Sequence, residues 1–438
     1  MSSLSRKLSA LDRAERRSLP PRLNVPAIGG AHQFAHYLPV AFELARRDAA
    51  DLTIFVPDEE AGKQVRAYAA RLGCPAPRTF IMTVPHWLWV SIPRKLRKIV
   101  GLVFWANRLR QCDVILCAER TSTLLRQLPG HCPPILHIPH GLGDRAVGFE
   151  RRFRHFDLVL VGGAKDRQRL VDAGVVDPAR CAITGPIKIA SVIRQGAHHK
   201  PLFGNERRTI LYNPHFDARL SSAEIFLDRL VADVLADDRF NLVIAPHVRM
   251  AASWDHKARW KWERHAVEGR IIVDLSSPRS LDMTYTMGAD LYVGDVSSQV
   301  YEYLLHPRPC LFLDAHKADW RGNPDYAMWS LGQVADSTAC IGKALDCAFS
   351  RHHEFLPLQI RRVRQVMEGI QWDDSFRPIF RGDDPVTRAA DIITRFALAQ
   401  IGHDRSPRQR RPIGRIHTGQ EIAPYELNWS AKASSAKS

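Results

Sequence analysis

Histidine, arginine and serine side chains follow several of the β-strands that this sequence predicts. The segment "IPHGLGDRAVGF" comes directly after the apolar run at 134–138, and it places His140 beside Gly141 with Arg145 further on. An imidazole at the end of a strand, next to flexible glycine backbone, is suited to removing a proton from a substrate hydroxyl. We therefore interpret His140 as a candidate catalytic base and Arg145 as a second catalytic candidate. The alternative is a structural role for His140.

A second segment, "GDVSSQVYEYLLH", predicts a phosphate site. Ser297 and Ser298 stand where a strand passes into a helix predicted at 297–305. Backbone amides at a helix N-terminus, together with two hydroxyls, can hold a phosphate group. The alternative is ordinary N-capping by serine. Glu302 lies one helical turn further on, where it either accepts hydrogen bonds from ribose hydroxyls or is a solvated charge.

Two further segments end strands of the second half of the chain. "APHVRM" places His247 and Arg249 after one strand, and "LYNPHFDARLSS" places Asn213 and His215 after another. Imidazole and guanidinium groups are common phosphate ligands. Each segment is weak evidence alone, but the carboxyl ends of parallel strands share one edge of a sheet, where such folds bind ligands. We therefore expect these side chains at one site.

A glycine turn precedes the first predicted helix. Gly29, Gly30 and His32 follow the first strand, and we interpret them as the border of an acceptor pocket, with tight helix–strand packing as the alternative. The turn is not GxGxxG, and "TGPIK" at 184–188 is not a Walker sequence, so neither a Rossmann dinucleotide site nor a P-loop is supported. No Asp-rich metal motif is present. We expect no cofactor and no protein-bound metal.

The elements that must position these residues are short apolar strands alternating with amphipathic helices. This alternation is typical of parallel sheets covered by helices on both faces. The expected strands are 22–28, 52–56, 78–82, 113–117, 134–138, 157–161 and 181–184, then 209–213, 241–245, 271–274, 290–294 and 309–313. Helices are expected at 221–236, 280–288 and 297–305.

Two doubly wound, Rossmann-like α/β domains facing a cleft follow from this pattern. The expected organisation is a basic tail (1–21), an N-terminal acceptor-side domain (22–192), a linker (193–208), a C-terminal donor-binding domain (209–383), a closing helix (384–402) and a basic disordered tail (403–438).

Composition and charge narrow the classes of function. The 438 residues are 45% hydrophobic and 25% charged, which is typical of a folded globular protein. A formal net charge of +16 indicates an acidic partner. Much of this excess lies in the two tails, and residues 86–110 carry six basic and no acidic residues. There is no helix-turn-helix, zinc or RNP signal, so we expect no nucleic-acid partner.

The basic stretch 86–110 also carries apolar residues at helical spacing. They are Leu96, Ile99, Val100, Val103 and Phe104. An apolar stripe flanked by cations and tryptophans suits a helix lying on an anionic membrane. The alternative is that the stripe packs on the first sheet. The N-terminus lacks a secretory apolar core, and no apolar run approaches the ~18 residues of a membrane span. We expect a cytoplasmic protein, peripheral on the inner face of the plasma membrane.

Taken together, these segments resemble the GT-B architecture and, within it, the CDP-glycerol glycerophosphotransferase family that builds teichoic-acid-like polymers. The resemblance rests on "PHG" (139–141), "FDLVLVGGAKDRQRL" (156–170), "ITGPIKIASV" (183–192), "ILYNPHFD" (210–217), "IAPHVRM" (244–250) and "ADLYVGDVSSQVYEYLLHPRPCLFLD" (289–314). The family usually reads "HGTPLK" where this chain has "HGLGDRAV", so the element after His140 is altered.

The resemblance implies roles for five of the candidate residues. His140 would be the base, His247, Ser297 and Ser298 would hold the donor pyrophosphate, and Glu302 would occupy the place of the family's acidic residue. The full set of expected donor-binding residues is Gly141, Asn213, His215, His247, Arg249, Asp295, Ser297, Ser298 and Glu302.

The function implied is transfer of glycerophosphate, or a related polyol phosphate, from a CDP-linked donor to a hydroxyl of a cell-envelope polysaccharide or lipid-linked acceptor. The same architecture serves nucleotide-sugar glycosyltransferases, which are the main alternative. A UDP-GlcNAc 2-epimerase-like enzyme and a non-catalytic scaffold are further alternatives.

Overall fold

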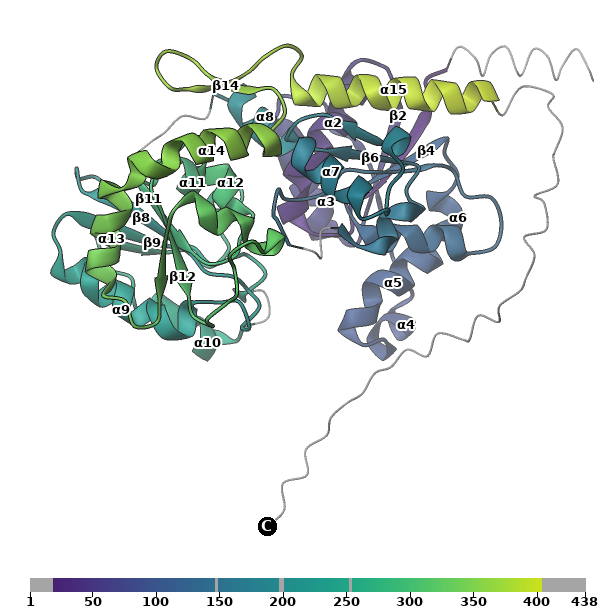
Figure 1. Ribbon diagram of the computed structural model, residues 1–438. Helices are drawn as coiled ribbons and strands as arrows, with labels where there is room; N and C mark the ends of the chain where they lie inside the picture. Colours follow the sequence, from purple (N-terminus) through teal and green to yellow (C-terminus); the bar gives the residue numbers. More distant parts are fainter. Residues whose placement is uncertain (1–18, 146–148, 197–200, 252–253, 404–438) are drawn as a thin grey trace, which may run out of the picture.

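The computed structural model describes residues 19–145, 149–196, 201–251 and 254–403. Within them the chain forms two α/β domains, each built on a parallel sheet (Figure 1). The expected basic tails lie outside the described residues, except for positions 19–21 and 403.

The N-terminal sheet has seven parallel strands in the order β3-β2-β1-β4-β5-β6-β7. Their bounds are β1 (Arg22–Pro26), β2 (Asp51–Val56), β3 (Arg78–Ile81), β4 (Val114–Cys117), β5 (Ile135–His137), β6 (Leu158–Val161) and β7 (Cys181–Ile183). The strand order steps outward from β1 in both directions, so β1 and β4 flank the switch point where ligands bind in doubly wound folds.

The C-terminal sheet has six parallel strands in the order β10-β9-β8-β11-β12-β13. Their bounds are β8 (Arg208–Asn213), β9 (Phe240–Ile244), β10 (Ile271–Val273), β11 (Leu291–Gly294), β12 (Cys310–Asp314) and β13 (Gln333–Asp336). A small antiparallel pair, β14 (Ile370–Trp372) and β15 (Pro378–Phe380), follows.

Helices cover both faces of each sheet. The α-helices are α2 (Phe34–Arg46), α3 (Glu59–Arg71), α4 (His86–Ser91), α5 (Arg94–Phe104), α6 (Ala106–Leu109), α7 (Ala164–Asp172), α8 (Ile187–Arg194), α9 (Ala223–Ala236), α10 (His256–Glu263), α11 (Thr284–Gly288), α12 (Gln299–Tyr303), α13 (Ile341–Ser350), α14 (His352–Val366) and α15 (Pro385–His403). The 3₁₀ segments are η1 (Ala31–Gln33), η2 (Arg120–Gln127), η4 (Arg151–His155), η5 (Pro178–Arg180), η7 (Pro278–Ser280) and η8 (Pro324–Leu331).

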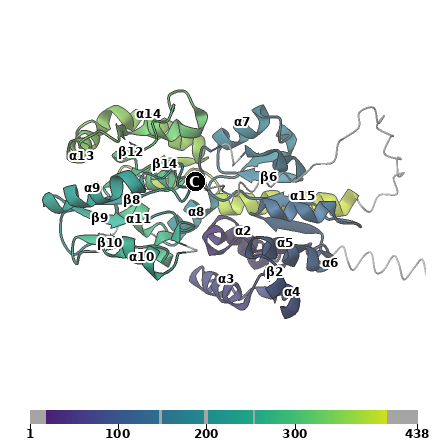
Figure 2. The same ribbon diagram turned by 90° about the horizontal axis from the view of Figure 1, so that it is seen from below.

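Strand side chains alternate between the two faces and build separate cores. In β4, Val114 and Leu116 pack beneath α2, α3, α8 and α15, whereas Ile115 and Cys117 pack beneath α6, η2 and α7. Helix α15 returns from the C-terminal domain and inserts Ala389 into the N-terminal core, as its course across that domain shows (Figures 1 and 2). The two domains are therefore joined at more than one point of the chain.

The expected architecture of two tandem parallel-sheet domains is confirmed, and each expected strand forms with small differences at its ends. Three local expectations differ. The helix expected at 280–288 begins at Thr284, after the 3₁₀ turn η7, and the helix expected at 297–305 covers only Gln299–Tyr303. Residues 193 and 194, expected within the linker, belong to α8. The domain boundaries stay a prediction, because α8 packs into the cores of both domains.

Helices α4 and α5 project from the N-terminal domain, away from its sheet (Figure 1). The apolar stripe predicted along 96–104 faces solvent, since Leu96, Ile99, Val103 and Phe104 are exposed while Leu102 is buried. The alternative that this stripe packs on the sheet is therefore wrong. Among the described helices, none is both long and apolar enough to cross a membrane.

Candidate active site

A cavity of about 390 Å³ lies between the two domains, at the carboxyl ends of their strands. Its volume falls in the usual range for small-molecule sites. Most of the predicted catalytic and donor-binding residues line it together, namely His140, Gly141, Arg145, His215, His247, Arg249, Ser297 and Ser298. The expectation that strand-end segments of both domains meet at one site therefore holds for these eight residues.

His140 follows β5 and is held as a neutral imidazole. Its Nδ1 lies 3.1 Å from the carbonyl oxygen of Ala118, which can only accept, so Nδ1 carries the proton and Nε2 presents a lone pair. The amide nitrogen of Gln33 contacts Nε2 at 3.3 Å, and Glu119 accepts the other bond from that amide. Burial lowers the pKa of His140 below its ordinary 6.5. This nitrogen is therefore available as a base at neutral pH.

His215 and His247 have the opposite tautomer. The Nδ1 of His215 accepts from the backbone amide of Asp217 at 3.0 Å, and that of His247 accepts from the amide of Arg249 at 3.2 Å. Because Nδ1 accepts in both rings, the proton of each neutral ring is on Nε2. Burial lowers the pKa of His215 to about 4 and that of His247 to about 3. Both rings therefore offer an N–H donor to a ligand.

Arg145, Arg249, His215 and His247 form what we call the cationic wall of the cavity, and aromatic stacking orders part of it. The guanidinium of Arg249 lies 4.5 Å from the centre of the Phe216 ring, which packs on His215 and His247 with ring centres 4.3 and 4.9 Å away. Arg145 approaches from the N-terminal domain, and its buried Nη1 has no hydrogen-bond partner in the described part of the chain. A buried guanidinium nitrogen without a partner is costly, so an anionic ligand would satisfy it.

The two serines lie at the contact between the domains. Ser297 Oγ accepts from the amide of Gln299 at 3.3 Å, whereas Ser298, the N-cap residue of α12, makes no side-chain capping hydrogen bond. A Cβ at Gly141, whose φ is +89°, would lie 3.1 Å from Ser298 Oγ, and one at Gly143 would lie 3.3 Å from Ser298 Cβ. Glycine at these positions therefore lets the segment after His140 approach the C-terminal domain closely.

Three predicted donor-binding residues do not line the cavity. Asn213 is buried, its amide donates to the carbonyl of Ala245 at 2.7 Å, and its oxygen accepts from Tyr292 at 3.2 Å. The Asp295 carboxylate accepts from three backbone amides at 2.7 to 2.9 Å, and burial raises its pKa to about 6. Both side chains brace the loops that carry the cavity residues.

Glu302 is the third of these residues. It forms a buried ion pair with Lys188 of α8 at 2.6 Å, and both border a separate space of about 30 Å³. The alternative of a solvated charge is wrong, because only 7% of Glu302 is exposed. In this conformation the carboxylate joins α12 to α8.

Gly29, Gly30 and His32, predicted to border an acceptor pocket, lie between β1 and α2. The rings of His32 and His140 are 6.2 Å apart, and burial lowers the pKa of His32 to about 4. Gly30 has a φ of +96°, and a Cβ at Gly29 would overlap the Gln33 side chain at 1.8 Å. Gly29 therefore makes room for the amide side chain that contacts His140, and Gly30 provides the left-handed turn beside it.

Several cavity residues were not singled out from the sequence. Phe216 and Asp217 stand inside a segment already noted, one and two positions after His215. Gln33, which is not part of the cavity lining but contacts His140, directly follows His32. Arg120, Phe149 and Phe153 also line the cavity and lie in 3₁₀ or irregular segments without a strand signal. Within the described ranges, no cluster of three or more His, Cys, Asp or Glu side chains is placed to share a metal ion.

Two parallel-sheet domains joined by a strand-end cavity define the GT-B fold, and comparisons with known proteins agree. No protein-family model matches this sequence, and no curated protein sequence matches it. Solved structures share the fold at low identity. The wall teichoic acid polymerase TagF is 11% identical with a TM-score of 0.55, over 93% of this chain and 100% of that one.

Enzymes of other kinds are equally similar. A UDP-GlcNAc 2-epimerase from Neisseria meningitidis, solved with UDP-GlcNAc bound, is 12% identical with a TM-score of 0.52, over 86% of this chain and 100% of that one. The glycotransferase of kitacinnamycin is 15% identical with a TM-score of 0.51, over 86% and 99%. At such identities these likenesses establish the fold.

Proposed function

We propose that this chain is a transferase that moves a glycerophosphate or related polyol-phosphate group from a CDP-linked donor to a hydroxyl of a polysaccharide or lipid-linked acceptor. The observation that carries the proposal is the division of labour in the cavity. His140 presents an Nε2 lone pair that meets only the 3.3 Å contact from Gln33, while His215, His247 and Arg249 present imidazole and guanidinium N–H groups to the same cavity. A base opposite a cationic wall suits nucleophilic attack on a diphosphate.

In this mechanism an acceptor hydroxyl replaces the Gln33 amide at Nε2 of His140, whose 3.3 Å contact is longer than a usual hydrogen bond. His140 takes the hydroxyl proton while the oxygen attacks the β-phosphorus of the donor. The bond from that phosphorus to the bridging oxygen breaks, and CMP leaves with its electron pair. Gly29, Gly30 and His32, which surround Gln33, border the acceptor approach.

The cationic wall stabilises the charge that develops on the leaving nucleotide. Arg145 and Arg249 supply positive charge, and the Nε2 protons of His215 and His247 supply donors that need no reorganisation. These groups serve in place of a metal ion's charge, so we expect no metal requirement. Ser297 and Ser298 line the same cavity. In this mechanism their hydroxyls contact the pyrophosphate.

A nucleotide-sugar glycosyltransferase is the second candidate, because a cationic wall stabilises a departing nucleoside diphosphate equally well. One solved structure of the same fold is described as bound to UDP-GlcNAc, and another is described as TagF soaked with CDPG. Incubation of the full chain with CDP-glycerol, CDP-ribitol and UDP-sugars, with detection of CMP or UDP, separates the two. CMP release supports the proposal, UDP release supports the alternative, and absence of nucleotide binding by calorimetry supports a scaffold.

We also propose that α4 and α5 bind an anionic membrane surface, where a lipid-linked acceptor would reside. Trp87 is 70% exposed and Phe104 52% exposed, on a stretch with six basic and no acidic residues. An apolar stripe beside cations suits insertion at the headgroup level. This partner predicts binding to anionic vesicles that weakens as salt rises.

A further inference from the structure

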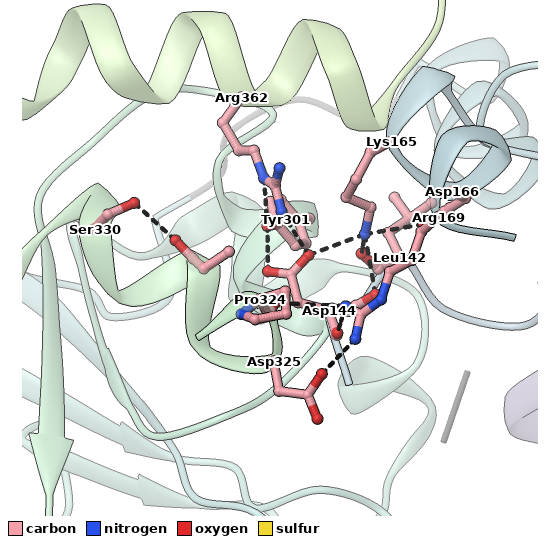
Figure 3. A network of polar contacts seen from close by, with 12 residues as sticks. Leu142, Asp144, Lys165, Asp166, Arg169, Tyr301, Pro324, Asp325, Ser330 and Arg362 are labelled. Atoms are coloured by element: carbon pink, nitrogen blue, oxygen red, sulfur yellow. Dashed lines mark hydrogen bonds and ion pairs between the residues drawn. The ribbon is translucent and has the colours of Figure 1, made fainter. Parts of the chain in front are cut away.

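Asp144 stands between the two candidate catalytic residues of the segment after β5, and it is fully buried. Its Oδ1 pairs with Lys165 at 3.1 Å and with Arg362 at 2.8 Å, and its Oδ2 accepts from the hydroxyl of Tyr301 at 2.6 Å. Figure 3 shows the carboxylate at the centre of this network. Two cations and a hydroxyl around one buried carboxylate make a strong, geometrically specific contact.

The network joins the two domains. Lys165 lies on α7 of the N-terminal domain, whereas Tyr301 lies on α12 and Arg362 on α14 of the C-terminal domain. Arg169 of α7 donates to the backbone carbonyl of Asp144 and pairs with Asp325 across the same boundary. The segment after β5 is therefore tied to both sides of the cleft.

The backbone beside Asp144 is held by the same groups. Lys165 Nζ donates to the carbonyls of Leu142 at 2.7 Å and Gly143 at 3.0 Å. Gly143 in turn packs against Ser298, where a Cβ would come within 3.3 Å. This is the stretch in which the sequence departs from the pattern of the family that it resembles, since "LGDR" stands in place of "TPLK" and Asp144 stands where that pattern has leucine.

Arg145 follows directly in the chain and has no comparable anchor on its Nη1. That buried nitrogen lacks a hydrogen-bond partner in the described residues, although the guanidinium lies close enough to His215 to lower the pKa of that ring. The place of Arg145 in the cavity therefore depends on its neighbour in the chain.

We propose that Asp144 is a positioning residue that locks the segment carrying His140 and Arg145 against the C-terminal domain and so holds Arg145 at the donor phosphates. The reaction that it serves is the proposed transfer, and its effect on the segment is independent of that reaction. Loss of the lock releases the segment, lowers the population of the binding-competent geometry and raises the donor KM more than it lowers kcat.

Tyr301→Phe tests the proposal with Tyr303→Phe as the matched control on the same helix. Tyr301→Phe removes one hydroxyl from the Asp144 network. Tyr303→Phe removes a buried hydroxyl that donates to the carbonyls of Asp290 and Pro309, inside the C-terminal domain. We measure amide hydrogen exchange of residues 138–145 by mass spectrometry on the full chain, together with donor KM and kcat.

For Tyr301→Phe we expect at least about tenfold faster exchange in this segment and about a tenfold rise in donor KM, the value of one hydrogen bond to a charged group. Tyr303→Phe is expected to leave both unchanged. Asp144→Asn is expected to exceed Tyr301→Phe in both effects; if it does not fold, the tyrosine pair decides alone. Equal exchange in the two tyrosine variants overturns the proposal. Exchange needs no substrate, so this result stands even when no donor is turned over.

Discussion

The cavity and the Asp144 network lie side by side and contain the same kinds of polar and charged side chain. They differ in whether those side chains have hydrogen-bond partners within the protein. In the network both carboxylate oxygens of Asp144 are bonded to partners from two domains. In the cavity the Nη1 of Arg145 has no hydrogen-bond partner within the described residues, and Nε2 of His140 meets Gln33 at 3.3 Å. One short segment after β5 supplies residues to both regions.

The difference separates architecture from chemistry. A fully bonded buried charge fixes geometry, and removal of one partner leaves an uncompensated charge that destabilises the fold. A buried polar group without a partner costs stability, and a ligand that pairs with it would remove that cost. The comparison therefore predicts which substitutions in this part of the molecule affect function and which affect folding.

The largest functional effect is expected for His140→Ala. Loss of the only lone pair that we assign to proton removal should lower kcat by about 10² to 10⁴-fold, the usual range for a general base. Nucleotide affinity, measured by calorimetry, should stay within about twofold, because the donor wall is untouched. His131→Ala, at an exposed position, is the control. Near-normal turnover by His140→Ala would remove the base from the mechanism.

Arg145→Met is expected to weaken donor binding by about 10 to 100-fold, the range for a hydrogen bond to a charged group. Arg219→Met is a sharp control, because Arg219 borders the same cavity but is 86% exposed and already paired with Asp217 at 2.7 Å. We expect less than about a twofold change there. Calorimetric titration with CDP measures both. Equal losses in the two variants would show that general positive charge, and not the unpartnered guanidinium, binds the donor.

The same distinction explains how much could be predicted from the sequence. Apolar strands and strand-end segments have local signals, so the sequence predicts both sheets. It also predicts one shared site for the residues at the strand ends, namely His140, Arg145, His215, His247, Arg249, Ser297 and Ser298. Whether a polar side chain meets a ligand or another part of the protein depends on residues far away in the chain. Asn213 bonds to Ala245 and Tyr292, and Glu302 pairs with Lys188.

Side-chain partners from other domains have no local signal at all. Asp144 and Arg362 are 218 positions apart in the chain, and the contact between them becomes visible only when α14 is placed beside α7. The short helix α12 is a similar case. The apolar spacing predicts a helix to residue 305, but α12 ends at Tyr303. The spacing continues because Leu304 and Leu305 are also buried, although they lie outside the helix.

A smaller effect is expected in the pH dependence. His140 must be neutral to act as a base, and burial lowers its pKa below 6.5. The acid limb of kcat/KM should therefore lie below pH 6.5, with activity falling about tenfold per pH unit beneath it. Glu119→Gln removes a carboxylate that raises the pKa of His140, so the limb should move to lower pH. A limb above pH 6.5, or a shift upward in Glu119→Gln, would contradict the assignment.

The smallest effect is expected at α4 and α5, where the side chains that lack contacts within the protein are apolar. If unpartnered groups mark contact sites, the exposed stripe should bind lipid. Replacing Trp87 and Phe104 by serine should lower the fraction bound to anionic vesicles about fivefold in a flotation assay, because each ring loses apolar burial in the headgroup region. Replacing Trp260 and Leu235, which are 61% and 43% exposed on the C-terminal domain, is the matched control. If both double variants lose vesicle binding equally, unpartnered groups mark a ligand site only in the polar cavity. If only the Trp87 and Phe104 variant loses binding, the exposed apolar groups of α4 and α5 mark a contact site as well.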